Sequence, residues 1–108
     1  MAMFQARKLS AGQIEAAVTE LKNWRIEDNQ LRATLKFNDF NEAFGFLSRI
    51  ALIAEKADHH PDFFCSYNKV ELRLFTHSEK SITAKDLEMA KRINEIVGGG
   101  AASGGGGQ

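Results

Sequence analysis

The sequence predicts an α+β fold in which three helices cover one face of a four-stranded antiparallel sheet, in the order α-β-β-α-β-β-α. Three segments repeat apolar residues at helical spacing, and each begins with side chains suited to capping a helix. Two further pairs of segments alternate apolar and polar residues around a short turn, as antiparallel hairpins do. Because each strand is apolar on one side only, helices on that side would complete the core.

The composition predicts a single domain, residues 1–97, followed by a disordered glycine-rich tail, residues 98–108. The chain has 108 residues, and 44% of them are apolar, which is enough for one core. Acidic and basic residues are equal in number, so we expect no nucleic-acid or membrane partner. No apolar run approaches the ~20 residues of a membrane span, and the single cysteine fits a reducing compartment. We therefore expect a cytoplasmic location, with a nuclear one as the alternative.

The first half of the chain is expected to open with a helix and a hairpin. Ser10 and Gln13 have the spacing of a capping box, and apolar residues follow at helical spacing. Residues 24–27 and 30–37 then alternate, with Asp28-Asn29 as the turn between them. The register that keeps apolar side chains together pairs Ile26 with Leu31 and Trp24 with Ala33.

The central helix, Asp39–Lys56, is apolar nearly all round. One stripe consists of Phe40, Phe44, Leu47, Ala51 and Ala54, and a second consists of Phe46, Ile50, Ile53 and Ala57. Such a helix is buried on more than one side. Either it lies deep in its own core or its second side contacts another subunit, and the sequence leaves both interpretations open. In the second case, the stripe with Phe46, Ile50 and Ile53 would be the contact surface.

The second hairpin is expected to turn at Asn68-Lys69, because Asn tolerates a left-handed turn position. This register pairs Tyr67 with Val70, Cys65 with Leu72 and Phe63 with Leu74. Carried outward, it sets His60 opposite His77 on the other face of the sheet. Phe64 and Phe75 lie on that face too, which is left for a ligand or a partner. Residues Thr83 to Asp86 then begin the last helix, whose apolar stripe ends at Val97.

All three histidines of the chain, His59, His60 and His77, lie within one segment, residues 55–77, which contains the second predicted hairpin. Imidazole can donate or accept a proton near neutral pH, so a facing pair of His60 and His77, with His59 as a third proton carrier, predicts general acid–base catalysis. Glu55 could orient one imidazole or be an ordinary solvated charge. Adjacent histidines project in different directions, unlike the i, i+4 pair of a helical zinc site, so we expect no metal.

With those residues placed, the chain resembles the pterin-4a-carbinolamine dehydratase family. The matching pieces are Ala54-Glu-Lys56, His59-His-Pro61, Tyr67-Asn-Lys-Val70 and Thr76-His77, followed by Asp86. The resemblance implies the fold derived above and a hydro-lyase activity, the dehydration of 4a-hydroxytetrahydropterin to quinonoid dihydropterin. That reaction recycles the tetrahydrobiopterin cofactor of aromatic amino acid hydroxylases. The pterin is the substrate, so the resemblance implies no separate cofactor and no metal.

The resemblance also implies roles for individual residues. The catalytic residues would be His59, His60 and His77. The residues that contact the pterin would be Glu55, His59, His60, Pro61, Thr76, His77, Ser78, Glu79 and Asp86. Asp86 stands at the third position of its helix, where a carboxylate stabilises the helix dipole whether or not it takes part in catalysis.

Members of the family also bind the dimerisation segment of a transcription factor. The alternative function is therefore a non-enzymatic coactivator that binds a partner helix through the central helix, Asp39–Lys56. The resemblance implies a homodimer or homotetramer that uses the same helix.

Overall fold

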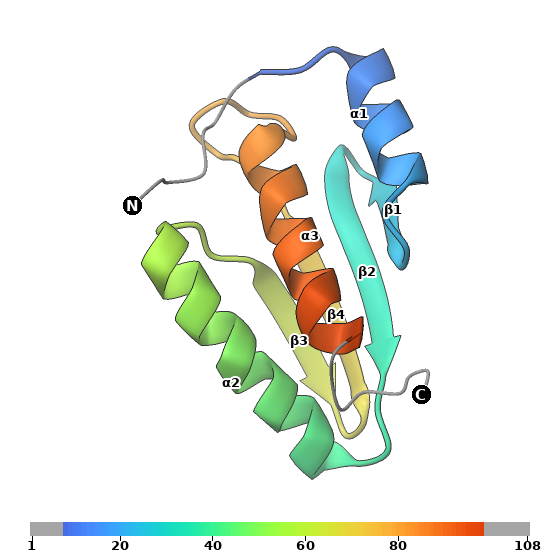
Figure 1. Cartoon of the computed structure of the whole chain (residues 1–108), viewed down its shortest axis with the longest axis vertical. Helices are drawn as coiled ribbons and strands as arrows, with labels where there is room; N and C mark the ends of the chain where they lie inside the picture. Colours follow the sequence, from blue (N-terminus) through green and yellow to red (C-terminus); the bar gives the residue numbers. More distant parts are fainter. Residues whose placement is uncertain (1–7, 99–108) are drawn as a thin grey trace.

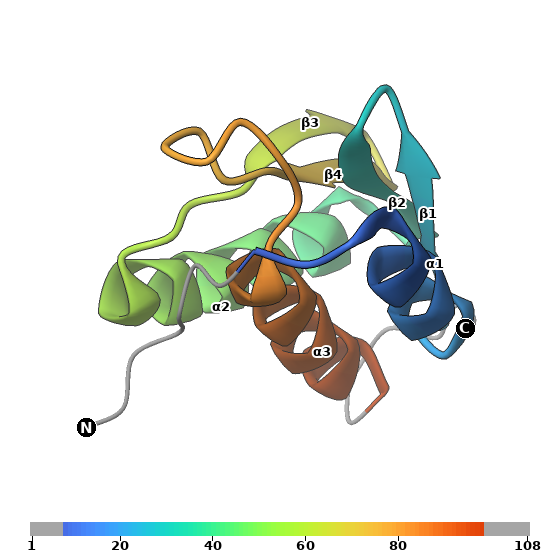
Figure 2. The same cartoon turned by 90° about the horizontal axis from the view of Figure 1, so that it is seen from above.

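The predicted fold class is confirmed by a computed structural model that describes residues 8–98. The elements are α1 (Ala11–Thr19), β1 (Trp24–Glu27), β2 (Gln30–Lys36), α2 (Phe40–Ala57), β3 (Asp62–Ser66), β4 (Lys69–Leu74) and α3 (Ala84–Gly98). The strands form one antiparallel sheet in the order β1-β2-β4-β3. Figure 2 shows the helices on one side of this sheet, and Figure 1 shows α3 crossing it between α1 and α2. No helix within residues 8–98 is long and apolar enough to cross a membrane.

The predicted tail begins with Gly98, which is instead the last residue of α3. Its remaining residues, 99–108, lie outside the described residues, as do residues 1–7 of the predicted domain.

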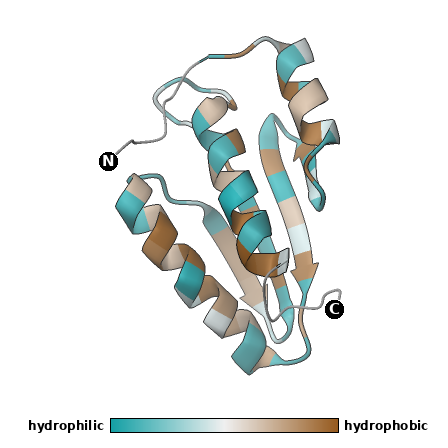
Figure 3. Cartoon of the chain, viewed as in Figure 1, coloured by the Kyte–Doolittle hydropathy of each residue, from teal (hydrophilic) through white to brown (hydrophobic). Residues whose placement is uncertain are grey.

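The first hairpin has the predicted turn and the predicted register. Asp28 and Asn29 have φ values of 54° and 61°, the two positive angles that a type I′ turn requires. Trp24 pairs with Ala33, and Ile26 pairs with Leu31. Hydrophobic and hydrophilic residues alternate along β2 in Figure 3, and its hydrophobic side chains are buried against the helices. The alternation therefore fixes which face of the sheet meets the core.

The second hairpin turns one residue earlier than predicted, so its predicted register is wrong. The turn residues are Tyr67 and Asn68, because Ser66 pairs with Lys69. Lys69 cannot be a turn residue, since it is the first residue of β4 and pairs with Lys36 at the end of β2. The Asn68 side chain also donates to the carbonyl of Phe37 at 2.9 Å. Contacts with β2 therefore set this turn.

The new register moves every pair of the hairpin by two residues. Phe63 faces Leu72, and Cys65 faces Val70. The ladder begins at Asp62, which pairs with Arg73, so neither His60 nor His77 belongs to it. The expectation that the sheet register sets these two histidines opposite each other is therefore wrong.

The second stripe of α2 belongs to the core of the chain itself. Phe46 is 0% exposed and Ile50 is 3% exposed, so these side chains are not the partner surface that the sequence suggested. The first stripe is divided instead. Leu47 and Ala54 are buried, whereas Phe40 and Phe44 lie at the surface with 51% and 57% of their area exposed. Of the two apolar sides of α2, the one with Phe40 and Phe44 is left without a partner inside the described chain.

Candidate active site

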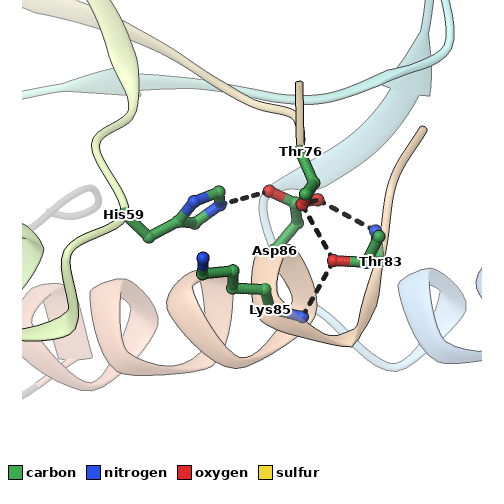
Figure 4. Close-up of polar contacts among 5 residues, drawn as sticks. All are labelled: His59, Thr76, Thr83, Lys85 and Asp86. Carbon is green, nitrogen blue, oxygen red and sulfur yellow. Dashed lines mark hydrogen bonds and ion pairs between the residues drawn. The ribbon is translucent and has the colours of Figure 1, made fainter. Parts of the chain in front are cut away.

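One buried network contains every buried polar or charged residue among residues 8–98. These residues are His59, Thr76, Thr83 and Asp86. They come from three places in the fold, the end of α2, the end of β4 and the start of α3, and Figure 4 shows them converging on the Asp86 carboxylate. A buried polar group destabilises the fold unless it is hydrogen-bonded. Each of these four side chains makes at least one hydrogen bond to another of them.

Asp86 holds the centre of the network because of its position in α3. Its Oδ2 atom accepts the backbone N–H of Thr83 at 2.9 Å, three residues earlier, and the Thr83 hydroxyl accepts the backbone N–H of Lys85 at 3.2 Å. These are capping bonds at a helix N-terminus, where a carboxylate is also favoured by the helix dipole. The cap thus directs the Asp86 side chain back over the first turn of α3, toward the segment that contains His59.

His59 follows a left-handed residue that ends α2. Asp58 has a φ of 55°, and its N–H donates to the Glu55 carbonyl at 3.3 Å. The N–H of His59 donates to the Ala54 carbonyl at 3.1 Å. This pair of bonds is the Schellman pattern, which fixes the path of the chain as it leaves a helix. The His59 ring then meets Asp86, with Nε2 at 2.5 Å from Oδ1, at a site where His59 is 8% exposed and Asp86 is 0% exposed.

His60 and Glu55 form a second pair, at the surface. Nε2 of His60 lies 3.0 Å from Oε1 of Glu55, and the two side chains are 56% and 81% exposed. Both belong to the same helix end as His59, so the Schellman turn places one imidazole inward and the next outward. Pro61 follows and leads into β3. The imidazole that Glu55 contacts is that of His60, and such an exposed pair contributes little to stability.

The third histidine lies in a tight loop after β4. Thr76 pairs with Ser81 in an antiparallel bridge, with N–H to carbonyl distances of 3.0 and 3.4 Å, so the residues between them form a short hairpin loop. His77 is exposed in this loop, and its ring packs edge-on against Phe75 at a centroid distance of 5.2 Å. Ser78 and Glu79 belong to the same loop. The Thr76 hydroxyl, by contrast, is buried and donates to Oδ2 of Asp86 at 2.8 Å.

The network brings the two histidine-bearing segments together by a different route from the one predicted. His59 adjoins His60 and Thr76 adjoins His77 in the chain, and both pairs are joined through the Asp86 carboxylate. The sequence pointed to His59, Thr76 and Asp86 but gave no site role to Thr83. The only feature of the sequence that marks Thr83 is its capping spacing to Asp86, and this spacing indicates where a helix begins but not whether the side chain is buried. Within residues 8–98, no three His, Cys, Asp or Glu side chains gather closely enough to hold a metal ion.

Comparison with known proteins assigns the chain to a family. The family model for pterin 4 alpha carbinolamine dehydratase matches residues 7–96, which include α1, the sheet and all the network residues. The chain belongs to the pterin 4 alpha carbinolamine dehydratase family. A crystal structure from Brucella melitensis, described as a transcriptional coactivator/pterin dehydratase, superposes with a TM-score of 0.79 at 40% identity. The match covers 82% of this chain and 97% of that one.

Relatives of this dehydratase family occur in distant organisms. A Sulfolobus acidocaldarius protein, provisionally named pterin-4-alpha-carbinolamine dehydratase, is 45% identical over 89 residues, covering 82% of this chain and 98% of the relative. A Brucella ovis protein with the same provisional name is 41% identical over 93 residues, covering 84% of this chain and 96% of the relative. Nearly the whole length of these relatives is therefore matched by the domain described above.

Proposed function

We propose that the protein catalyses the dehydration of 4a-hydroxytetrahydropterin to quinonoid dihydropterin and so recycles the tetrahydrobiopterin cofactor of aromatic amino acid hydroxylases. In this reaction the C4a–O bond breaks, the hydroxyl leaves as water after gaining a proton, and N5 loses its proton as the C4a=N5 bond forms. No electron is gained or lost, so the protein needs to supply only a proton donor, a proton acceptor and a binding surface. Each positioned acid or base contributes about 10²–10⁴-fold to such a rate.

The observation that carries this proposal is the buried contact between His59 and Asp86 in a chain of the dehydratase family. A carboxylate hydrogen-bonded to one imidazole nitrogen orients the ring and leaves the other nitrogen for a substrate. The bond of 2.5 Å joins residues 27 positions apart, and both side chains are withdrawn from water. Family membership supports the pterin as the substrate, and the imidazole–carboxylate pair supports proton transfer as the chemistry.

The remaining site residues take supporting roles in this proposal. His60 and His77 are the exposed imidazoles, which can meet the substrate from solvent, and Glu55 orients His60. The pterin would contact the segment His59–Pro61 and the loop from Thr76 through His77 and Ser78 to Glu79. Asp86 reaches the substrate through His59, because its own carboxylate is fully buried.

A stopped-flow assay tests the proposal directly. The decay of 4a-hydroxytetrahydropterin is followed with and without the protein, and acceleration above the spontaneous rate is expected for the wild type. His59→Ala, His60→Ala and His77→Ala should each lose a factor of about 10²–10⁴, while Lys91→Ala on the exposed side of α3 should not. A wild-type protein that fails to accelerate the decay would overturn the proposed function, as would near-normal rates in the three histidine variants.

We also propose that the protein self-associates as a homodimer or homotetramer through α2. The support is the exposed aromatic pair Phe40 and Phe44, whose ring centroids lie 5.9 Å apart, with the exposed Leu52 farther along the same helix. Helix-on-helix packing needs an apolar ridge of this kind. A second copy of the chain is the occupant we favour, because each copy would cover the other's exposed aromatic side chains. A helix of another protein, as in the coactivator alternative, is the competing occupant.

The oligomeric state tests this second proposal. Light scattering after gel filtration should give a multiple of the chain mass for the wild type and the single-chain mass for Phe44→Asp. Phe64→Asp is the matched control, because Phe64 is similarly exposed at 53% but pairs with Glu71 on the opposite face of the sheet. A monomeric wild type would overturn self-association and leave the aromatic side chains for a different partner.

A further inference from the structure

The direction of every hydrogen bond in the buried network follows from counting hydrogens. Each threonine hydroxyl has one hydrogen to donate and lone pairs to accept. The Thr83 hydroxyl accepts from the N–H of Lys85, and the Thr76 hydroxyl donates to Asp86. The 2.8 Å bond between the two hydroxyls is therefore donated by Thr83 to Thr76. The bonds form a single chain that runs from Lys85 N–H through both hydroxyls to the carboxylate, and aligned bonds of this kind strengthen one another.

This chain leaves Asp86 with one way to meet His59. Oδ2 is engaged by two donors, the Thr76 hydroxyl and the Thr83 N–H, at 2.8 and 2.9 Å. Oδ1 is directed at Nε2 of His59. Because an ionised carboxylate only accepts hydrogen bonds, Nε2 must be the nitrogen that bears a proton. Figure 4 shows the second ring nitrogen, Nδ1, on the edge of the imidazole that is turned away from Asp86.

We propose that Thr76 and Thr83 are positioning residues that hold Asp86 so that His59 keeps its Nε2 proton and exchanges protons through Nδ1. The exchange with substrate at Nδ1 rests on the proposed dehydratase function, but the state of the ring does not. The Thr76 hydroxyl is the informative member. Capping of α3 uses the Thr83 hydroxyl and the Thr83 N–H. A role limited to helix capping would therefore not require Thr76.

Nitrogen-15 NMR of the histidine side chains reports the ring state without substrate. The chain has three histidines, so the spectrum holds only three imidazoles. In the wild type, Nε2 of His59 should stay protonated through a pH series while Nδ1 gains and loses its proton. Thr76→Val should release Asp86 and produce a mixture of both ring forms, and Thr76→Ser should restore the wild-type pattern. Thr19→Val is the control, because within the described residues the Thr19 hydroxyl bonds only a backbone carbonyl in α1.

Kinetics supply the second readout on the same proteins. Thr76→Val should lower kcat about tenfold with little change in KM, on the scale at which outer partners of histidine act in metal sites. Thr76→Ser should recover most of that loss. The proposal is overturned if Nε2 proves to be the nitrogen that titrates, or if Thr76→Val leaves both the His59 spectrum and kcat unchanged. A wild type without dehydratase activity would remove only the assignment of Nδ1 as the atom that meets the substrate, since the spectra decide the rest.

Discussion

Replacing Asp86 with asparagine tests the role of the buried carboxylate most directly. The side chain keeps its shape, but one of its two acceptor atoms becomes an NH₂ donor. Two donors already face Oδ2, the Thr76 hydroxyl and the Thr83 N–H, so the amide oxygen is expected to take that place. The NH₂ group then faces Nε2 of His59. The imidazole must now accept there, which moves its proton to Nδ1 and reverses the ring form proposed for the wild type.

The cost to stability can be worked from the same bonds. A hydrogen bond to a charged acceptor is worth about 1.5–3 kcal/mol and one to a neutral acceptor about 0.5–1.5 kcal/mol, so the two retained bonds lose about 1 kcal/mol each. The missing charge at the start of α3 adds about 0.3–1 kcal/mol. A total of about 2–3 kcal/mol lies below the 5–15 kcal/mol by which domains are usually stable. The variant should therefore fold, with Tm lowered by roughly 10–20 °C.

Three measurements decide the outcome of Asp86→Asn. Thermal denaturation gives the stability loss, nitrogen-15 NMR gives the ring form of His59, and the stopped-flow assay gives kcat. We expect a loss in kcat of about 10²–10⁴-fold; the upper figure is the loss that follows when the same change reverses the imidazole of the serine protease triad. Asp62→Asn at the exposed start of β3 is the control and should change none of the three. Asp86→Asn with an unchanged His59 ring and near-normal turnover would refute the reasoning.

Four further substitutions test the two sides of α2, the surface pair of His60 and Glu55, and a helix cap. Phe46→Ala should lower the free energy of unfolding, measured by urea denaturation, by about 3–5 kcal/mol, because the side chain is fully buried. Phe44→Ala should lower it by under about 1 kcal/mol within a single chain, because that side chain is exposed. Equal losses would contradict the finding that α2 has one buried and one exposed apolar side. Glu55→Gln should leave stability within about 0.5 kcal/mol and lower turnover less than tenfold, since its bond to His60 is exposed; a larger kinetic loss would make Glu55 a direct participant. Ser10→Ala should cost about 1 kcal/mol by opening the capping box of α1, and an unchanged unfolding midpoint would refute that.

The two hairpins show what local sequence can and cannot specify. At Asp28-Asn29 both residues tolerate positive φ, so turn chemistry and apolar pairing give the same register. In the second hairpin Tyr67 adopts a φ of 52°, which its residue type disfavours, so the sequence points one position too late. A shift of two residues keeps every side chain on the same face, so the apolar pattern cannot correct the error. The pairing of Lys69 with Lys36 corrects it, and that contact joins strands that are far apart in the sequence.

The central helix shows a different limit. Its two apolar stripes overlap, and each has the spacing of a buried face. Packing against the sheet selects the stripe with Phe46 and Ile50, and leaves Phe40 and Phe44 outside. Periodicity gives the helix, its length and its capping residue Asp39, all of which the structure confirms. It cannot rank two stripes of similar hydrophobicity, because the ranking depends on how α3 and the sheet fill the space beside α2.

The candidate site was predictable as a set of residues but not as a geometry. His59, Thr76 and Asp86 were each predicted as site residues, because they belong to the pattern that resembles known sequences. Their mutual bonds join positions 27 and 10 residues apart and depend on where α3 crosses the sheet. The prediction that His60 faces His77 relied on a sheet register that the structure does not have. Thr83 was missed because the sequence pattern of a capping threonine is the same whether the side chain is buried or exposed.

The other helices of the chain show that capping alone does not account for the buried network. α1 is capped by Ser10 and α2 by Asp39, and both caps make their bonds at the exposed surface. α3 could be capped in the same way, yet its cap is buried and extended by a hydroxyl and an imidazole that no cap requires. Buried hydrogen-bonded polar groups add little net stability compared with apolar groups of similar shape, and removing one partner destabilises the fold strongly. In the proposed function, the extension supplies a carboxylate with a fixed orientation and, through it, an imidazole with a fixed proton, which proton transfer requires and folding does not.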